Sequence, residues 1–133
     1  NVDRWHYYHY HAPSIAIIDF GSAATGTGAP EGRRDNCMQI FACHFMTPVD
    51  ENTSIDHWLH VKNFSADEAT NKALSADFRV AFAEDKSILE AIQVNGQKCA
   101  ARKTIKVAID AAPRRMRRMV ERLQDADKAA LAG

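Results

Sequence analysis

The chain has 133 residues, which is enough for one domain with its own hydrophobic core. Its 17 basic and 17 acidic side chains cancel, so no net field draws it to nucleic acid, and no apolar run is long enough for a membrane span. The three cysteines, Cys37, Cys43 and Cys99, are odd in number and lack CxxC spacing, which predicts reduced thiols in a cytoplasmic protein.

The first residues are aromatic and strand-like, and they follow no methionine. We therefore expect a piece of a longer protein that forms a single domain over residues 1–133. His6, His9 and His11 lie in this segment, and His9 and His11 would share one face of a strand. A two-histidine metal site is one interpretation. No cysteine or carboxylate joins them at a known ligand spacing, so the lining of a sheet or a subunit contact is favoured.

The rest of the sequence predicts an α+β fold, an antiparallel sheet packed on a long helix plus a C-terminal helix. The predicted elements are strands at residues 14–20, 37–46 and 53–64, a long helix at 66–96, a short strand at 105–107 and a helix after Asp110. The glycine-rich segment 21–36 fits neither phosphate-binding pattern and is predicted to be a surface loop. Ser65 is the expected N-cap of the long helix and Gly96 its end.

The 37–46 run is apolar on both faces, which indicates a central strand, and a short turn joins it to 53–64 as an antiparallel hairpin. His44 comes near the end of the first of these strands. A lone histidine there is more often a structural residue, and a pocket histidine that binds a ligand is the alternative.

Asp85 falls in the middle of an apolar stripe on the long helix. The stripe positions are spaced by fours and threes, at residues 74, 78, 81, 85, 88 and 92. A carboxylate in an apolar interior is strongly penalised unless a cation or hydrogen-bond donors meet it. Pattern alone favours a structural partner such as an arginine, a histidine or backbone amides, and a metal ion is the alternative. The arginines of the last helix indicate a solvated amphipathic surface rather than a nucleic-acid interface.

Several segments together resemble the C-terminal half of Rieske non-heme iron oxygenase α subunits, closest to the vanillate O-demethylase, phenoxybenzoate dioxygenase and dicamba monooxygenase type. The "EDK" helix is the most specific of these segments. They are residues 43–52 (CHFMTPVDEN), 62–64 (KNF), 82–93 (FAEDKSILEAIQ) and the start of the last helix at Asp110, Ala111, Arg114 and Arg115.

The resemblance implies a helix-grip fold and a mononuclear Fe(II) held by two histidines and one carboxylate. By the resemblance, Asp85 is that carboxylate, His44 matches a position that contacts the aromatic substrate in some members, and Asn63 lies near the site. It also implies electrons from a reductase through a [2Fe–2S] Rieske cluster, activation of O₂ to hydroxylate or O-demethylate an aromatic compound, and a trimer.

Two motifs of that family are missing from the sequence. Neither the Cys-x-His and Cys-x-x-His pair of the Rieske cluster nor the segment with the two iron-binding histidines is present. We therefore expect the isolated chain to lack the N-terminal Rieske domain, to hold an incomplete iron site and to be inactive. The alternative is a helix-grip domain that binds a hydrophobic ligand without metal. An interaction domain that uses the arginine-rich helix is the third and least favoured class.

Overall fold

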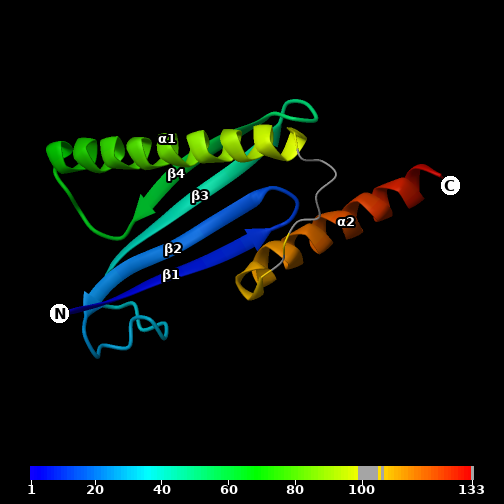
Figure 1. Cartoon of the computed structure of the whole chain (residues 1–133). Coiled ribbons are helices and arrows are strands. Elements are labelled where there is room, and N and C mark those ends of the chain that lie inside the picture. The colour runs from blue at the N-terminus through cyan, green and yellow to red at the C-terminus, as the bar shows by residue number, and fades with distance from the viewer. Residues whose placement is uncertain (99–104, 106, 133) are drawn as a thin grey trace. The chain divides into compact units, whose positions relative to one another are not determined.

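The computed structural model describes residues 1–98, 105 and 107–132. It contains four strands, two α-helices and a short 3₁₀-helix (Figure 1), which confirms the predicted α+β class. In chain order the elements are β1 (Val2–His11), β2 (Ile15–Ala24), β3 (Met38–Pro48), β4 (Ser54–Lys62), α1 (Glu68–Lys98), η1 (Ala108–Asp110) and α2 (Ala111–Leu131). The chain divides into two compact units, residues 1–64 with 107–133 and residues 65–106. The helix-grip arrangement itself stays a prediction.

The four strands form one antiparallel sheet in the order β1-β2-β3-β4. The predicted hairpin is confirmed as β3 and β4, and β3 occupies an interior position as expected. Because side chains alternate along a strand, the register places two different sets of residues on the two faces. Trp5, Gly21 and Gln39 lie in one cross-strand row, and Tyr10, Ala16 and His44 lie in another row on the opposite face.

The N-terminal segment and the beginning of the predicted loop both belong to the sheet. Val2–His11 is a full strand, which adds a first strand to those expected at residues 14–20, 37–46 and 53–64. Gly21–Ala24, predicted as loop, extends β2 instead because Gly21 pairs with both Trp5 and Gln39. Glycine usually weakens a strand, so the sequence pattern ended β2 too early. The loop itself follows, and Gly26, Gly28 and Gly32 have positive φ angles there.

A small core lies where this loop meets the sheet. Trp5, Ala23 and Ala29 are buried together, and Arg34 lies 3.8 Å from the centre of the Trp5 ring. Asp19 is also buried, and its carboxylate accepts hydrogen bonds from Nε1 of Trp5 at 2.9 Å and from Nε2 of Gln39 at 2.7 Å. The Arg34 guanidinium lies 3.5 Å from the second carboxylate oxygen. These bonds satisfy a buried charge and tie the loop to the sheet.

The long helix is confirmed, with different end residues. Its N-cap is Asp67 rather than Ser65, because the Asp67 carboxylate accepts the amide of Thr70 at 2.7 Å. The hydroxyl and then the amide of Thr70 hold the pKa of Asp67 below its usual range. At the other end, α1 passes through Gly96 to Lys98. A glycine inside a helix costs only about 1 kcal/mol relative to alanine, so Gly96 weakens the helix without ending it.

The expected burial of the α1 stripe is not observed. No described residue of α1 is buried, and Asp85 is exposed. Several large apolar side chains of the helix are exposed as well, among them Ile88, Leu89 and Ile92. The fours-and-threes spacing therefore identified a helix, but the burial that it predicted for one face is not seen in the structure.

The predicted helix after Asp110 is α2, and Asp110 is its N-cap residue. The Asp110 carboxylate accepts the amide of Val107 at 2.9 Å rather than an amide of α2. The short strand predicted at 105–107 includes residue 106, which lies outside the described residues, and Ile105 and Val107 have no regular secondary structure. No helix in the described part of the chain is both long and apolar enough to cross a membrane.

Gly21→Ala should destabilise the sheet by about 2 kcal/mol, because overpacking cannot be relieved where backbone meets a buried ring. An added Cβ would lie 2.6 Å from Cη2 of Trp5 and closer still to the carbonyl oxygen of Met38. Gly96→Ala is the matched control, since a Cβ there meets nothing within 4 Å. It should raise stability by up to about 1 kcal/mol. Urea denaturation of both variants measures the difference, and equal midpoints would contradict this account of Gly21.

Candidate functional site

The candidate site begins with a polar cluster on one face of the β3–β4 hairpin. Nδ1 of His44 lies 2.8 Å from Oδ2 of Asp56, with His44 on β3 and Asp56 on β4. The His44 side chain is 14% exposed and the Asp56 side chain 44%, so the imidazole is enclosed while the carboxylate reaches solvent. This pairing links His44, which the sequence analysis singled out, to Asp56, which it did not.

The register of the hairpin creates the cluster. His44 pairs directly with Trp58, and Asp56 lies two residues before Trp58 on the same face. The register places Asp56, Trp58, His60 and Lys62 on one face of β4. His60 lies opposite Ala42, which is only 4% exposed.

The turn before β4 holds this register. The Val49 amide donates to the Thr53 carbonyl at 2.9 Å, and the Asn52 amide donates to the Asp50 carboxylate at 2.8 Å. The Asn52 amide, followed by the Thr53 hydroxyl, holds the pKa of Asp50 below its usual range. A local carboxylate–amide bond of this kind is typical of turns, and turn geometry sets hairpin register.

His60 adds a second imidazole to the same face. Its ring meets the Trp58 ring edge-on with centroids 5.3 Å apart. Burial, and to a lesser extent the positive charge of His44, lowers the pKa of His60 below its ordinary value. An ordinary histidine already carries little charge at neutral pH, and the lowered pKa of His60 makes its ring neutral there.

Asn63 lies apart from this cluster. Its amide oxygen accepts the Gln39 amide at 2.8 Å, and its amide nitrogen donates to the Cys37 carbonyl at 3.0 Å. Both ends of the side chain thus extend the contact between β3 and β4 beyond the last strand pair. The five steps from Trp58 to Asn63 span roughly 17 Å along a strand, so the structure does not bring Asn63 to His44. Its predicted place near a substrate stays a prediction.

Asp85 lies on α1, in the second unit of the chain. Its neighbour Lys86 forms an (i, i+4) pair with Glu90 at 3.7 Å, and within residues 65–98 Asp85 itself has no ion pair. The structural pairing considered for Asp85 therefore finds no partner within this helix. Among residues 1–98, 105 and 107–132, no group of three or more His, Cys, Asp or Glu side chains could hold a metal ion.

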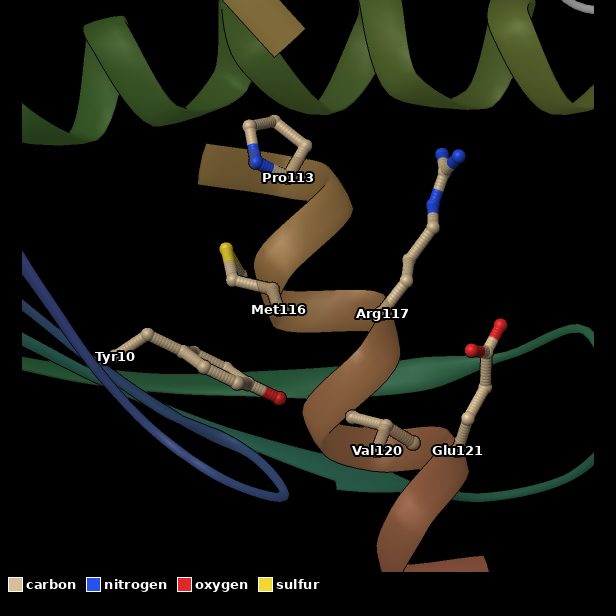
Figure 2. Close-up of a pocket in the computed structure, with 6 residues that line it drawn as sticks. All are labelled: Tyr10, Pro113, Met116, Arg117, Val120 and Glu121. Carbon is tan, nitrogen blue, oxygen red and sulfur yellow. The ribbon is translucent and has the colours of Figure 1, made fainter. Parts of the chain in front are cut away.

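A hollow that the sequence did not predict lies beside Tyr10 and the start of α2 (Figure 2). Its volume is about 430 Å³, and its walls are mostly apolar. The lining residues are Tyr10, Pro113, Met116, Arg117, Val120 and Glu121. Tyr10 shares a cross-strand row with Ala16 and His44, so the hollow and the histidine cluster belong to the same face of the sheet. The register relates Tyr10 to His44, and the hollow relates Tyr10 to α2; neither relation can be read from the sequence.

Comparison with known proteins identifies the family. Residues 1–126 match the vanillate O-demethylase oxygenase C-terminal domain. The chain belongs to this family. The family resemblance noted in the sequence is therefore confirmed, and it covers nearly the whole chain.

The relatives of this family member are oxygenase subunits and components. The chain is 35% identical over 133 residues to the toluene-4-sulfonate monooxygenase system iron-sulfur subunit of Comamonas testosteroni, covering 98% of this chain and 38% of that protein. It is 31% identical over 135 residues to a vanillate O-demethylase oxygenase subunit of Pseudomonas sp. (strain ATCC 19151), covering 98% and 40%. The oxygenase component of chloroacetanilide N-alkylformylase from Rhizorhabdus wittichii is 30% identical over 94 residues, covering 69% and 26%.

The chain thus spans about two fifths of the length of the first two relatives. No solved structure matches it. Most of the length of each of these relatives therefore lies outside the region aligned with this chain.

Acidification should destabilise the fold through His60. Since its folded pKa lies below the unfolded value, the unfolded chain binds the proton more readily, and stability falls as the pH drops through about 6.5. His60→Gln should make the unfolding free energy less dependent on pH between 7.5 and 5.5. His9→Gln, at an exposed position of β1, is the matched control and should keep the wild-type slope. Equal slopes in all three proteins would refute the role of His60.

Proposed function

We propose that this chain is the C-terminal part of an oxygenase component that hydroxylates or O-demethylates an aromatic substrate. The observation that carries the proposal is the family match over residues 1–126, together with relatives named as oxygenase subunits. This match favours the oxygenase over a metal-free carrier of hydrophobic ligands. The parent protein would receive electrons from a reductase through a [2Fe–2S] Rieske cluster held outside this chain.

Asp85 is the residue that we propose as an iron ligand. Carboxylate oxygens suit Fe(II), and a site of two histidines and one carboxylate leaves positions open for O₂ chemistry. The exposed Asp85 side chain, without an ion pair within its own helix, supports this role. The two histidine ligands would come from outside this chain. The 133-residue chain alone is therefore proposed to be inactive.

His44 is the residue that we propose to contact the substrate. Its ring is largely enclosed, and Nδ1 is bonded to Asp56, so Nε2 is the ring nitrogen that can face a ligand. Trp58 lies directly across from it, and aromatic side chains are common in the walls of small-molecule sites. The substrate class that fits is an aromatic ring with an oxygen-bearing substituent. Asn63, which holds the start of β3, would support this region from a distance.

The remaining proposals concern the parent protein as a whole. They are a reductase partner, a homotrimer and a cytoplasmic location, with neither nucleic acid nor a membrane as a partner. The relative from Comamonas testosteroni is named as one subunit of a monooxygenase system, which supports a separate electron-supplying component. The balanced net charge of the chain supports the exclusion of nucleic acid.

Asp85→Asn in the full-length protein should reduce the mononuclear iron content strongly, while the iron–sulfur cluster remains. The reason is that an amide is a weaker ligand than a carboxylate and carries no charge to offset that of the metal. Metal analysis together with the visible absorption of the cluster separates the two iron pools. Asp77→Asn is the matched control, since it makes the same change at an exposed position of the same helix. Full retention of mononuclear iron and turnover by Asp85→Asn would refute the ligand role.

A further inference from the structure

We propose that Asp56 is a positioning residue that holds His44 in one tautomer and one orientation toward the substrate. The inference rests on the proposed function, because it concerns how His44 meets an aromatic ligand. It is carried by the 2.8 Å contact between Nδ1 of His44 and Oδ2 of Asp56. Asp56 was not singled out from the sequence, because only the register reveals this contact.

The chemistry of the two groups fixes which atom carries the proton. An ionised carboxylate can only accept hydrogen bonds, so Nδ1 of His44 must be the donor. The hydrogen bond made by one ring nitrogen determines the state of the other. Nε2 then faces a ligand as an acceptor in the neutral ring and as a donor in the imidazolium. Both states suit an oxygen substituent, either a hydroxyl that donates or an acid group that accepts.

The exposure of Asp56 and His44 indicates that their contact orients His44 more than it stabilises the fold. Asp56 is 44% exposed, and ion pairs at such sites contribute little to folding because water screens them. His44, at 14%, is enclosed, so rotation of its ring is limited mainly by its neighbours. A carboxylate that reaches in from the solvent side to hold an enclosed imidazole is the usual way that proteins orient a functional histidine. Loss of Asp56 should therefore change ligand binding more than it changes stability.

The residues around His44 favour a flat ligand. In its cross-strand row, His44 lies between Ala16 on β2 and Trp58 on β4. The Ala16 methyl group adds little bulk on one side, and the Trp58 indole presents an aromatic surface on the other. Ala42, the residue opposite His60, is small as well. An aromatic ring placed along this row can stack on Trp58 while its oxygen substituent meets Nε2 of His44.

The test uses the full-length protein and vanillate as the probe, with toluene-4-sulfonate as the second acid and toluene as the analogue without an acid group. Asp56→Asn should raise the Kd for both acids on the order of tenfold, the loss expected when one positioned hydrogen bond is released. Binding of toluene should not change. His44→Ala should show the same pattern, and the double variant should be no worse than His44→Ala alone. Asp56→Glu should restore part of the affinity, because it keeps the carboxylate.

A second readout does not depend on binding or turnover. Nitrogen-15 spectra of histidine-labelled, metal-free protein should show His44 protonated at Nδ1 in the wild type and a changed proton distribution in Asp56→Asn. The His44 signal is identified by its absence from His44→Ala. Asp35→Asn is the matched control, because Asp35 is exposed and lies in the 25–37 loop. It should leave both the spectra and the Kd values unchanged.

The outcomes distinguish the two proposals. If His44→Ala weakens acid binding while Asp56→Asn alters neither the Kd nor the His44 spectrum, the positioning role is overturned and the substrate contact survives. If His44→Ala leaves the binding of both acids unchanged, or if wild-type protein binds neither acid, the proposed substrate contact fails and the positioning role fails with it. A thermal unfolding midpoint that drops in Asp56→Asn without any change in Kd would assign Asp56 to stability instead.

Discussion

The register between β3 and β4 is the constraint on which the candidate site depends. Successive side chains of a strand point to opposite faces, so a slip of one residue would move the whole β4 set to the other face of the sheet. The pairing of His44 with Trp58 places Asp56 and His60 on either side of that row. The turn bonds at Asp50 hold the register, although they lie outside the cluster. A local turn and the alternation of side chains along the strands thus determine which residues of the site lie together.

The opposite face of the sheet is closed by different means. There Asp19 is buried, and it is neutralised and hydrogen-bonded by Arg34, Trp5 and Gln39. An arginine stacked on a tryptophan provides both the charge and the apolar surface that a buried carboxylate needs. This arrangement ties the loop after β2 to the sheet. The two faces therefore divide the structural and the chemical roles between them.

Much of the fold could be read from the sequence, because most elements have strong local signals. The alternation of apolar residues predicts the hairpin, and the spacing by fours and threes predicts the long helix. The helix start at Asp110 predicts α2. The errors lie where a local signal competes with a distant contact. Gly21 was taken as the start of a loop, yet it lies in a strand because the Trp5 ring needs the space above it. Ser65 and Asp67 are both good capping residues, and only the bond to Thr70 distinguishes them.

The candidate site was less predictable than the fold for the same reason. His44 was singled out by its place near the end of a strand, and Asp85 by its place in an apolar stripe. Strand alternation puts Asp56 on the same face of β4 as Trp58, but nothing in the sequence fixed how β4 lines up with β3. Tyr10 likewise joins the His44 row only through two successive strand pairings. Contacts of this kind depend on register, which no single segment encodes.

Asp85 lies in an apolar row of α1 that is exposed in the structure. Its helix exposes Ile88 at 60% and Ile92 at 61%, and apolar side chains in such a row are normally covered. The chain spans 38% of its toluene-4-sulfonate relative, so most of that protein's length lies outside the aligned region. Any surface that covers the stripe must also remove water from Asp85. A carboxylate tolerates such a loss only when a cation or several donors replace the water, and a divalent metal supplies the largest local charge available. The apolar row that made Asp85 anomalous in the sequence therefore supports the proposal that Asp85 binds a cation.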